Sequence, residues 1–178
     1  LQSRNFPIIN NSDGFWALPL ERVVHLDING GEPSYSKNYR HILANLPPSI
    51  KSLRLNTNGS TVLTELLPLV ERGVEVTVTV SFDGIGEVHD FVRWPIKWDE
   101  FYKNLLIYKS MPVNLNLWTT VSVLNQHQLS DMIAFAHEHD IDHEYAYLKH
   151  PAVLDVNNQD QSSIDAYILE QKQLRGLA

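Results

Sequence analysis

Three short polar stretches of the sequence carry residue types that could bind a small ligand. They are Gly30–Pro33, Asn56–Gly59 and Ser81–Gly84, and each follows a segment in which apolar and polar residues alternate. A glycine pair lets a ligand approach the backbone closely, because no Cβ stands in the way. The Asn, Ser, Asp and Glu side chains add hydrogen-bonding groups on short stems. Taken singly, each stretch is also compatible with an ordinary turn between a strand and a helix.

The elements that must position these stretches follow one another in a regular order. Strands are expected over 23–29, 51–57, 74–82, 113–123 and 142–148, and helices over 36–45, 61–72, 98–110 and 125–139, with a last helix over 162–174. Ser60 and Asn125 are the expected N-caps of the second and fourth helices. Strands that alternate with helices through short connections indicate βα units and a parallel sheet. The polar stretches should therefore meet at the edge where the strands end, and together they suit a zwitterionic amino acid and a ribose.

One face of every expected strand is polar. Val76, Val78 and Val80 alternate with Thr77 and Thr79, and the other strands follow the same pattern. A doubly wound sheet buries both faces, and a closed eight-stranded barrel fills its interior mainly with Val, Ile and Leu. We therefore expect a curved sheet with helices on one side and an open polar concavity on the other. A polar face that contacts only solvent is the alternative.

The composition narrows the class of protein. A chain of 178 residues with 43% hydrophobic and 20% charged residues is typical of one globular domain. Its net charge of −7 argues against a nucleic-acid surface, and no apolar run has the length of a membrane span. The start of the chain lacks a signal-peptide pattern, so a cytoplasmic location is expected. There is no cysteine, which excludes disulfides and thiolate ligands within this chain.

The ordered series of motifs resembles the radical S-adenosylmethionine (radical SAM) enzymes. The three polar stretches are followed by Asp90–Arg93, and residues 98–104, 119–125 and 150–155 look like the subgroup with a shortened "twitch" extension. The resemblance covers about residues 20–156. It implies an α/β fold: a partial, open βα barrel of the radical SAM type, incomplete, with five parallel strands and helices on the outer face. Residues 23–150 would form this core, 1–22 an N-terminal segment, and 151–178 a tail or the start of a truncated extension.

The resemblance also implies an S-adenosylmethionine site at the strand ends. Gly30, Gly31 and Glu32, followed by Pro33, would contact the methionine amino group, largely through the backbone. The methionine carboxylate would be held by Ser81 and Arg93. Asn58 and Asp83 would lie near the ribose or the carboxylate. Asn125 and Leu148 would lie near the adenine.

A radical SAM enzyme further needs three cysteines in one loop to hold a [4Fe–4S] cluster. Thiolates ligate such clusters, and this chain has none. We therefore expect the chain to be a fragment or remnant of such an enzyme, with the cluster in the full-length parent only and without radical chemistry of its own. Its substrate, a small molecule or a peptide, is not defined by these motifs. Exposed barrel edges would favour pairing with another copy.

Two other functions stay open beside this one. The chain could be a non-catalytic βα module that binds or scaffolds, or an unrelated βα-barrel enzyme that uses His25 and Asp27 as an acid–base pair. A metal site at His137, His139 and His143 is not expected, because helical residues two apart do not share a face.

Overall fold

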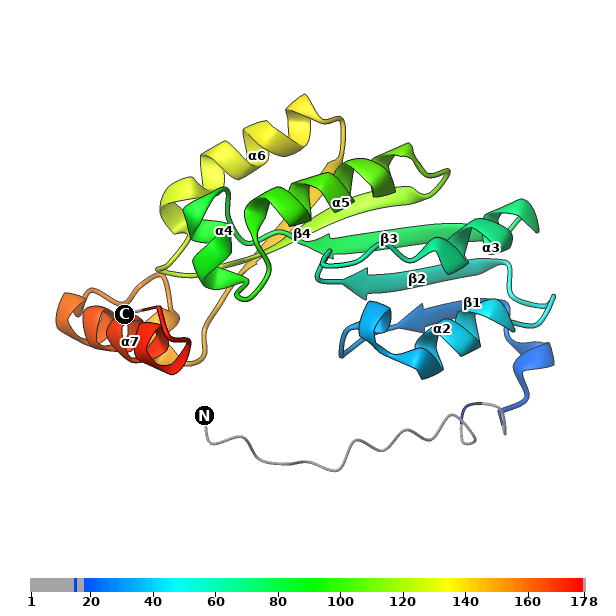
Figure 1. Cartoon of the computed structure of the whole chain (residues 1–178), viewed down its shortest axis with the longest axis horizontal. Helices are drawn as coiled ribbons and strands as arrows, with labels where there is room; N and C mark the ends of the chain where they lie inside the picture. The colour runs from blue at the N-terminus through cyan, green and yellow to red at the C-terminus, as the bar shows by residue number, and fades with distance from the viewer. Residues whose placement is uncertain (1–14, 16–17, 178) are drawn as a thin grey trace.

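Five parallel strands form one sheet, and they lie side by side in the order of the chain (Figure 1). The computed structural model describes Phe15 and residues 18–177. The strands are β1 (His25–Ile28), β2 (Ser52–Thr57), β3 (Glu75–Ser81), β4 (Asn114–Val121) and β5 (Asp142–Tyr147). Each lies within a segment in which the alternation predicts a strand. A short helix near Ser12 and Asp13 was also expected, and it lies outside the described residues.

The register of the strands keeps residues of one kind on one face. Leu55 of β2 pairs with Val78 of β3, while Thr79 pairs with Asn116 and Ser81 with Trp118 on β4. Side chains alternate between the faces of a strand, so in-phase pairing gives one continuous apolar face and one continuous polar face.

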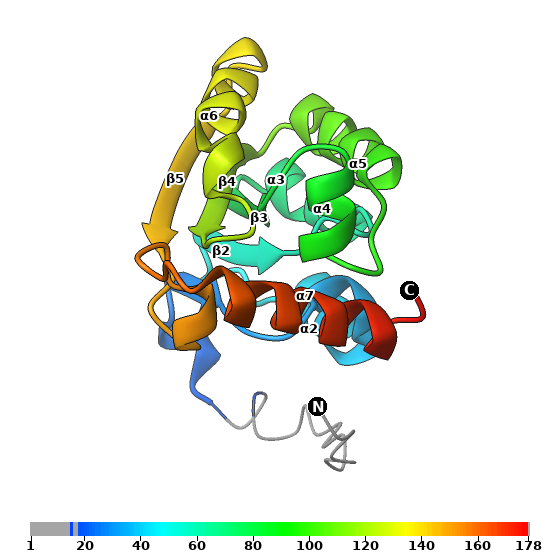
Figure 2. The ribbon, with the colours of Figure 1, turned by 90° about the vertical axis from the view of Figure 1, so that its left-hand side faces the viewer.

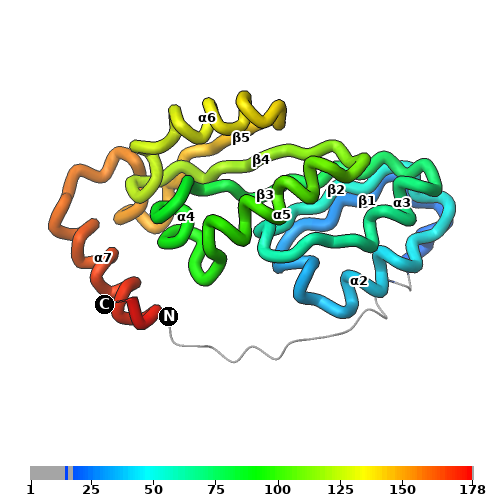
Figure 3. The backbone as a smooth tube through the Cα atoms, turned by 45° about the horizontal axis from the view of Figure 1, so that its top comes forward, coloured from blue at the N-terminus to red at the C-terminus, as the bar shows by residue number. Residues whose placement is uncertain are grey.

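Helices cover the apolar face of the sheet and leave the polar face open (Figures 1 and 2). The helices of this cover are α2 (Lys37–Ala44), α3 (Leu67–Glu71), α5 (Trp98–Ser110) and α6 (Leu129–Glu138). Two further helices, α4 (Glu87–Val92) and α7 (Gln161–Leu174), lie toward the carboxyl ends of the strands (Figures 1 and 3). Short 3-10 turns complete the chain: η1 (Leu20–Arg22), η2 (Pro33–Tyr35), η3 (Thr64–Leu66), η4 (Gln126–Gln128) and η5 (Ala152–Leu154).

The hydrophobic core lies between the apolar sheet face and these helices. Leu53, Val78 and Leu117 of three neighbouring strands are fully buried against Phe101 and Leu105 of α5. Burial of each such side chain stabilises the fold by about 1.5–3 kcal/mol. The opposite face lacks this cover, so the expected architecture of a sheet with helices on one side only is confirmed. Within the described part of the chain, no helix combines the length and apolar character needed to cross a bilayer.

The helix expected over 61–72 is shorter than the sequence indicates. It begins as η3 and continues as α3, with Pro68 in the first turn of α3. Proline lacks the backbone N–H and is tolerated only in a first turn, so α3 begins at Leu67 rather than near residue 61. Ser60 is consequently not the N-cap, and its buried hydroxyl has no hydrogen-bond partner.

Candidate functional site

The loop after β1 presents two glycines to open space. Gly30 has φ 91° and Gly31 has φ 64°, and a Cβ added to either would meet no atom within 4 Å. Glycine is therefore required at both positions by the positive φ angles and not by a lack of space for a side chain. Both residues are exposed, so their peptide groups are accessible to a ligand at this end of the sheet.

Glu32 joins the ends of β1 and β2. One carboxylate oxygen accepts hydrogen bonds from the Ser34 N–H (3.0 Å) and the Thr57 hydroxyl (2.8 Å), and the other accepts from the Asn58 N–H (2.6 Å). Pro33 is buried and opens η2. Because the Glu32 carboxylate is committed to these donors, the groups that this loop leaves available are the peptide groups of its glycines.

The loop after β2 is fixed against α5. The Asn58 side chain accepts a hydrogen bond from the Ser60 N–H (2.9 Å), and Asn104 of α5 donates to the Gly59 carbonyl (2.9 Å). A Cβ at Gly59, which has φ 74°, would lie 2.9 Å from the Phe101 ring. This stretch therefore acts as a close-packed turn, and Asn58 uses its carbonyl oxygen to hold it.

Asp83 and Arg93 form an ion pair at the carboxyl ends of β3 and β4. Asp83 is 6% exposed, and it accepts from the Thr120 N–H (2.7 Å) and from Nη1 of Arg93 (3.2 Å). Burial raises the pKa of the Asp83 carboxyl, and the Arg93 charge opposes that rise. The Nε atom of Arg93 is buried and has no hydrogen-bond partner, which leaves one guanidinium donor for another acceptor.

Asn125 braces the ends of β3 and β4 and does not cap a helix. Its fully buried side chain accepts from the Ser122 N–H (2.7 Å) and donates to the carbonyls of Asp83 and Thr120, each at 3.0 Å. The expected role as an N-cap is wrong, because Asn125 precedes only the short turn η4, makes no side-chain cap hydrogen bond to it, and uses its amide on these strand ends.

A cavity of about 290 Å³ brings three of the expected residues together. Asp83, Arg93 and Leu148 line it, with Thr120 between them. Tyr167 and Arg175, from α7 and its C-cap, line the same cavity. The polar-face alternation could have indicated Thr120, but no local signal places α7 here. Ser81 does not line this cavity; it lies two residues before Asp83 and lines a neighbouring cavity on the concave face.

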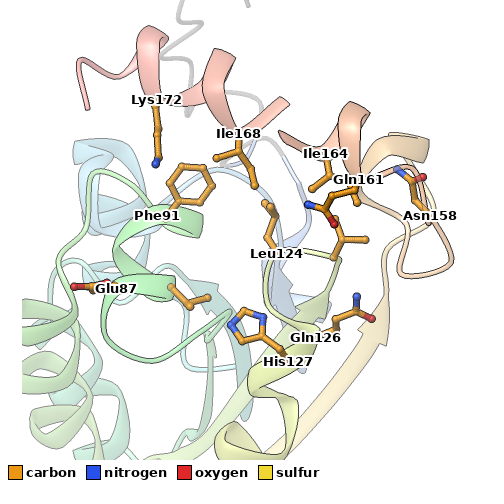
Figure 4. A pocket seen from close by; sticks show the side chains of 12 residues that line it. Glu87, Phe91, Leu124, Gln126, His127, Asn158, Gln161, Ile164, Ile168 and Lys172 are labelled. Atoms are coloured by element: carbon orange, nitrogen blue, oxygen red, sulfur yellow. The ribbon is translucent and has the colours of Figure 1, made fainter. Parts of the chain in front are cut away.

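A larger and more apolar cavity of about 550 Å³ lies beside the first (Figure 4). Phe91 and Leu124 line both cavities, so the two adjoin. Ile164 and Ile168 of α7 form the other wall, and Lys172 extends from α7 at the rim (Figure 4). Both cavities therefore depend on the position of α7.

The other candidate groups from the sequence are not brought together. The His25 ring bonds to the Ser52 hydroxyl (2.6 Å), and no hydrogen bond or ion pair joins His25 to Asp27 in the described part of the chain. Among the same residues, no three His, Cys, Asp or Glu side chains gather as a metal site. His139 instead contacts Tyr102 (3.0 Å), and His143 contacts Thr119 (2.8 Å).

The chain was compared with protein families, curated proteins and solved structures. No protein-family model matches the sequence, and no curated protein matches it. Solved structures with the same fold do match, and they confirm the expected α/β class, a partial, open βα barrel with five parallel strands.

The matched structures are of SuiB from Streptococcus suis. The chain matches SuiB bound to S-adenosylmethionine with a TM-score of 0.56 and 16% identity. It matches SuiB alone at 0.59 and SuiB bound to the precursor peptide SuiA at 0.58, both with 15% identity. The alignments cover 85% of this chain and 36–37% of SuiB. The likeness at this identity is one of fold.

Proposed function

We propose that this chain is an S-adenosylmethionine-binding core with the radical SAM fold. The observation that carries the proposal is the Arg93 guanidinium, which lines a cavity at the strand ends and keeps a buried Nε donor without a partner. A carboxylate such as that of methionine would satisfy this donor with a charge-assisted hydrogen bond.

The neighbouring loops supply the complementary groups. The open peptide groups of Gly30 and Gly31 would meet the methionine amino group. The Ser81 hydroxyl, which lines the neighbouring concave cavity, would reach the carboxylate held by Arg93 from that side. Glu32, Asn58, Asp83 and Asn125 would act mainly by holding these loops, because their side chains are already engaged. Pro33 would fix the first loop, and Leu148 would give an apolar contact near the adenine. S-adenosylmethionine bound to SuiB, which shares the fold, supports this assignment.

The residues present do not fit an iron–sulfur cluster. Clusters of this kind are held by Cys thiolates, and none of the 178 residues is cysteine. Radical chemistry is therefore not assigned to this chain. We propose that its full-length parent is an enzyme with a twitch extension. A substrate peptide is the partner that we propose, since SuiB, which shares the fold, has been solved with its precursor peptide.

Isothermal titration with S-adenosylmethionine, methionine and adenosine tests the proposal. We expect S-adenosylmethionine and methionine to bind more weakly to Arg93→Ala by about tenfold or more, as one charge-assisted hydrogen bond is lost. Ser81→Ala should weaken both ligands by a smaller factor, and adenosine should bind all variants alike. Lys103→Ala and Ser130→Ala, which remove an exposed cation and an exposed hydroxyl on the outer helices, are the controls.

Two results would overturn the proposal. One is a folded wild-type chain that shows no heat of binding with S-adenosylmethionine, and the other is binding that Arg93→Ala leaves unchanged. Binding of other ligands without S-adenosylmethionine would favour the second candidate, a non-catalytic binding module, which the absence of cysteine favours.

A further inference from the structure

The concave face of the sheet carries a group of polar side chains that the fold itself does not use. Arg54 of β2, Asn116 of β4 and Glu144 of β5 point to this face, and Trp118 lies among them with 36% of its surface exposed. In the described part of the chain, the side chains of Arg54 and Glu144 make no hydrogen bond and no ion pair. The side chains on this face are therefore available to a ligand.

Two cavities connect the charged side chains across the sheet. Their volumes are about 280 and 320 Å³, and Arg54, Asn116 and Glu144 line both. Asp142 lies two residues before Glu144 on β5 and therefore on the same face of the sheet. It lines the second cavity. A ligand that fills this space would contact a guanidinium on one wall and two carboxylates on the other.

Asn116 provides an unsatisfied acceptor between these walls. Its Oδ1 atom is buried and has no hydrogen-bond partner. A buried polar atom without a partner costs roughly 1–3 kcal/mol, so an N–H donor from a ligand would be stabilising here. The hydroxyl of Thr79 lines the same cavity and can donate to or accept from a peptide group.

The distance between the charges sets the size of the ligand. Arg54 on β2 and the carboxylates on β5 are separated by three strand steps, which is about 14 Å along the sheet and less across its concave side. An extended peptide spans that distance with about four residues. A single free amino acid is too short to place its ammonium and carboxylate at both walls.

We propose that the concave face selects a peptide segment with a basic side chain directed at Asp142 and Glu144 and an acidic side chain directed at Arg54, about four residues apart in an extended chain, so that both side chains point to the same side. Asn116 accepts a hydrogen bond from a backbone N–H of the segment, and the Trp118 ring covers its middle. The inference rests on the proposed function, since it places this segment beside the cofactor site as its substrate. The three charged residues are specificity-determining residues.

Heteronuclear NMR on the whole ¹⁵N-labelled chain tests this inference. The reporter is the Trp118 indole N–H, which Trp118→Phe identifies among the four tryptophans. The probes are acetyl-Lys-Ala-Ala-Ala-Glu-amide, the same peptide with the two charges exchanged, and versions with Gln in place of Lys, Glu or both. We expect the better doubly charged peptide to bind about tenfold tighter than each singly charged peptide.

Substitutions then assign each charge to its wall. Arg54→Gln should remove the preference for Glu over Gln in the peptide, and Asp142→Asn with Glu144→Gln should remove the preference for Lys. Lys103→Gln and Glu138→Gln, on exposed helix positions, should change neither preference. Equal affinity for all peptides, no shift of the Trp118 signal, or a charge preference that survives the substitutions would each overturn the inference.

The same samples separate this inference from the proposed function. They are titrated with S-adenosylmethionine before any peptide is added. Cofactor binding without peptide selection overturns the inference alone. Peptide selection without cofactor binding overturns the proposed function and leaves a peptide-binding face.

Discussion

The carboxyl-edge loops and the concave face are built from the same residue types, yet they differ in how those residues are engaged. At the edge, the Glu32 carboxylate accepts three hydrogen bonds, and the Asn125 amide makes four, two of them to the carbonyls of Asp83 and Thr120. On the concave face, the Glu144 side chain makes no hydrogen bond within the described residues, and Asn116 keeps an unpaired oxygen. The Glu32 carboxylate and the Asn125 amide are therefore engaged within the fold, whereas these side-chain groups of the concave face are not.

The asparagine pair gives the largest expected contrast. Asn125→Ala would leave the Ser122 N–H and the carbonyls of Asp83 and Thr120 without a partner in a buried site. We expect the free energy of unfolding to fall by about 4 kcal/mol. Asn116→Ala removes a buried acceptor that has no partner, so the free energy of unfolding should not fall and is expected to rise by about 1 kcal/mol. Urea denaturation of both variants measures the difference, and equal losses would remove the distinction between the two regions.

The glutamate pair should behave in the same way with a smaller contrast. Glu32→Ala removes three hydrogen bonds to a carboxylate that ties β1 to β2, and we expect a loss of about 3 kcal/mol in unfolding free energy. Glu144→Ala should change that free energy by less than about 0.5 kcal/mol. Urea denaturation compares the two, with amide hydrogen exchange at Asn58 as a local probe. A stable Glu32→Ala protein with unchanged exchange would contradict the bracing role.

The arginine pair tests the ion pair at the strand ends. Arg93→Ala leaves the buried Asp83 carboxylate without a counter-charge, so the pKa of Asp83 should rise further. Because Arg93 is partly exposed, a modest loss of about 2 kcal/mol in unfolding free energy is expected near neutral pH. Arg54→Ala should alter neither quantity. Carbon-detected NMR titration follows the carboxyl, and a pKa of Asp83 that does not rise would show that Arg93 has no electrostatic effect on it.

The pH dependence of stability should separate a buried from an exposed histidine. His89 of α4 is fully buried against Trp98 and Phe101, and burial lowers its pKa from 6.5 to about 4. Between pH 6.5 and pH 4, the histidine is therefore protonated in the unfolded chain but not in the folded chain. The free energy of unfolding consequently falls as the pH decreases from about 6.5 to about 4. The effect is about 2 kcal/mol between pH 7 and pH 5.

Two variants isolate that effect. The unfolding free energy of wild type minus that of His89→Leu should increase by about 2 kcal/mol from pH 5 to pH 7, measured by urea denaturation at a series of pH values. His127→Leu, which replaces an exposed histidine, is the matched control for the substitution itself. A His89→Leu protein that keeps the full acid sensitivity would assign it to other groups.

Much of the fold could be predicted because it depends on local periodicity. The five strands and α5 lie where alternation and helical spacing indicate them. The polar and apolar faces were also predictable, since they follow from the period of a strand. Helix α4 was missed, because its six residues are too few to show a helical period. The start of α3 was misplaced, because Ser60 has a capping side chain but Pro68 decides the first turn.

The engagement of the site residues could not be predicted in this way. Asn125 has the sequence signature of an N-cap, and only the approach of β3 and β4 turns it into a brace. Tyr167 and Arg175 enter the cavity of Arg93 because α7 lies across the strand ends. Neither outcome has a counterpart in the local sequence.

The sequence by itself therefore determined which residues reach the strand ends and which face of each strand is polar. The tertiary structure alone decided which of those polar groups are already used. The physical reason is that alternation is set by neighbouring residues, whereas a hydrogen bond needs two groups within about 3 Å, and here its partners are far apart in the chain. Glu32 meets Asn58, and Asp83 meets Asn125 and Thr120, only because the parallel strands end together.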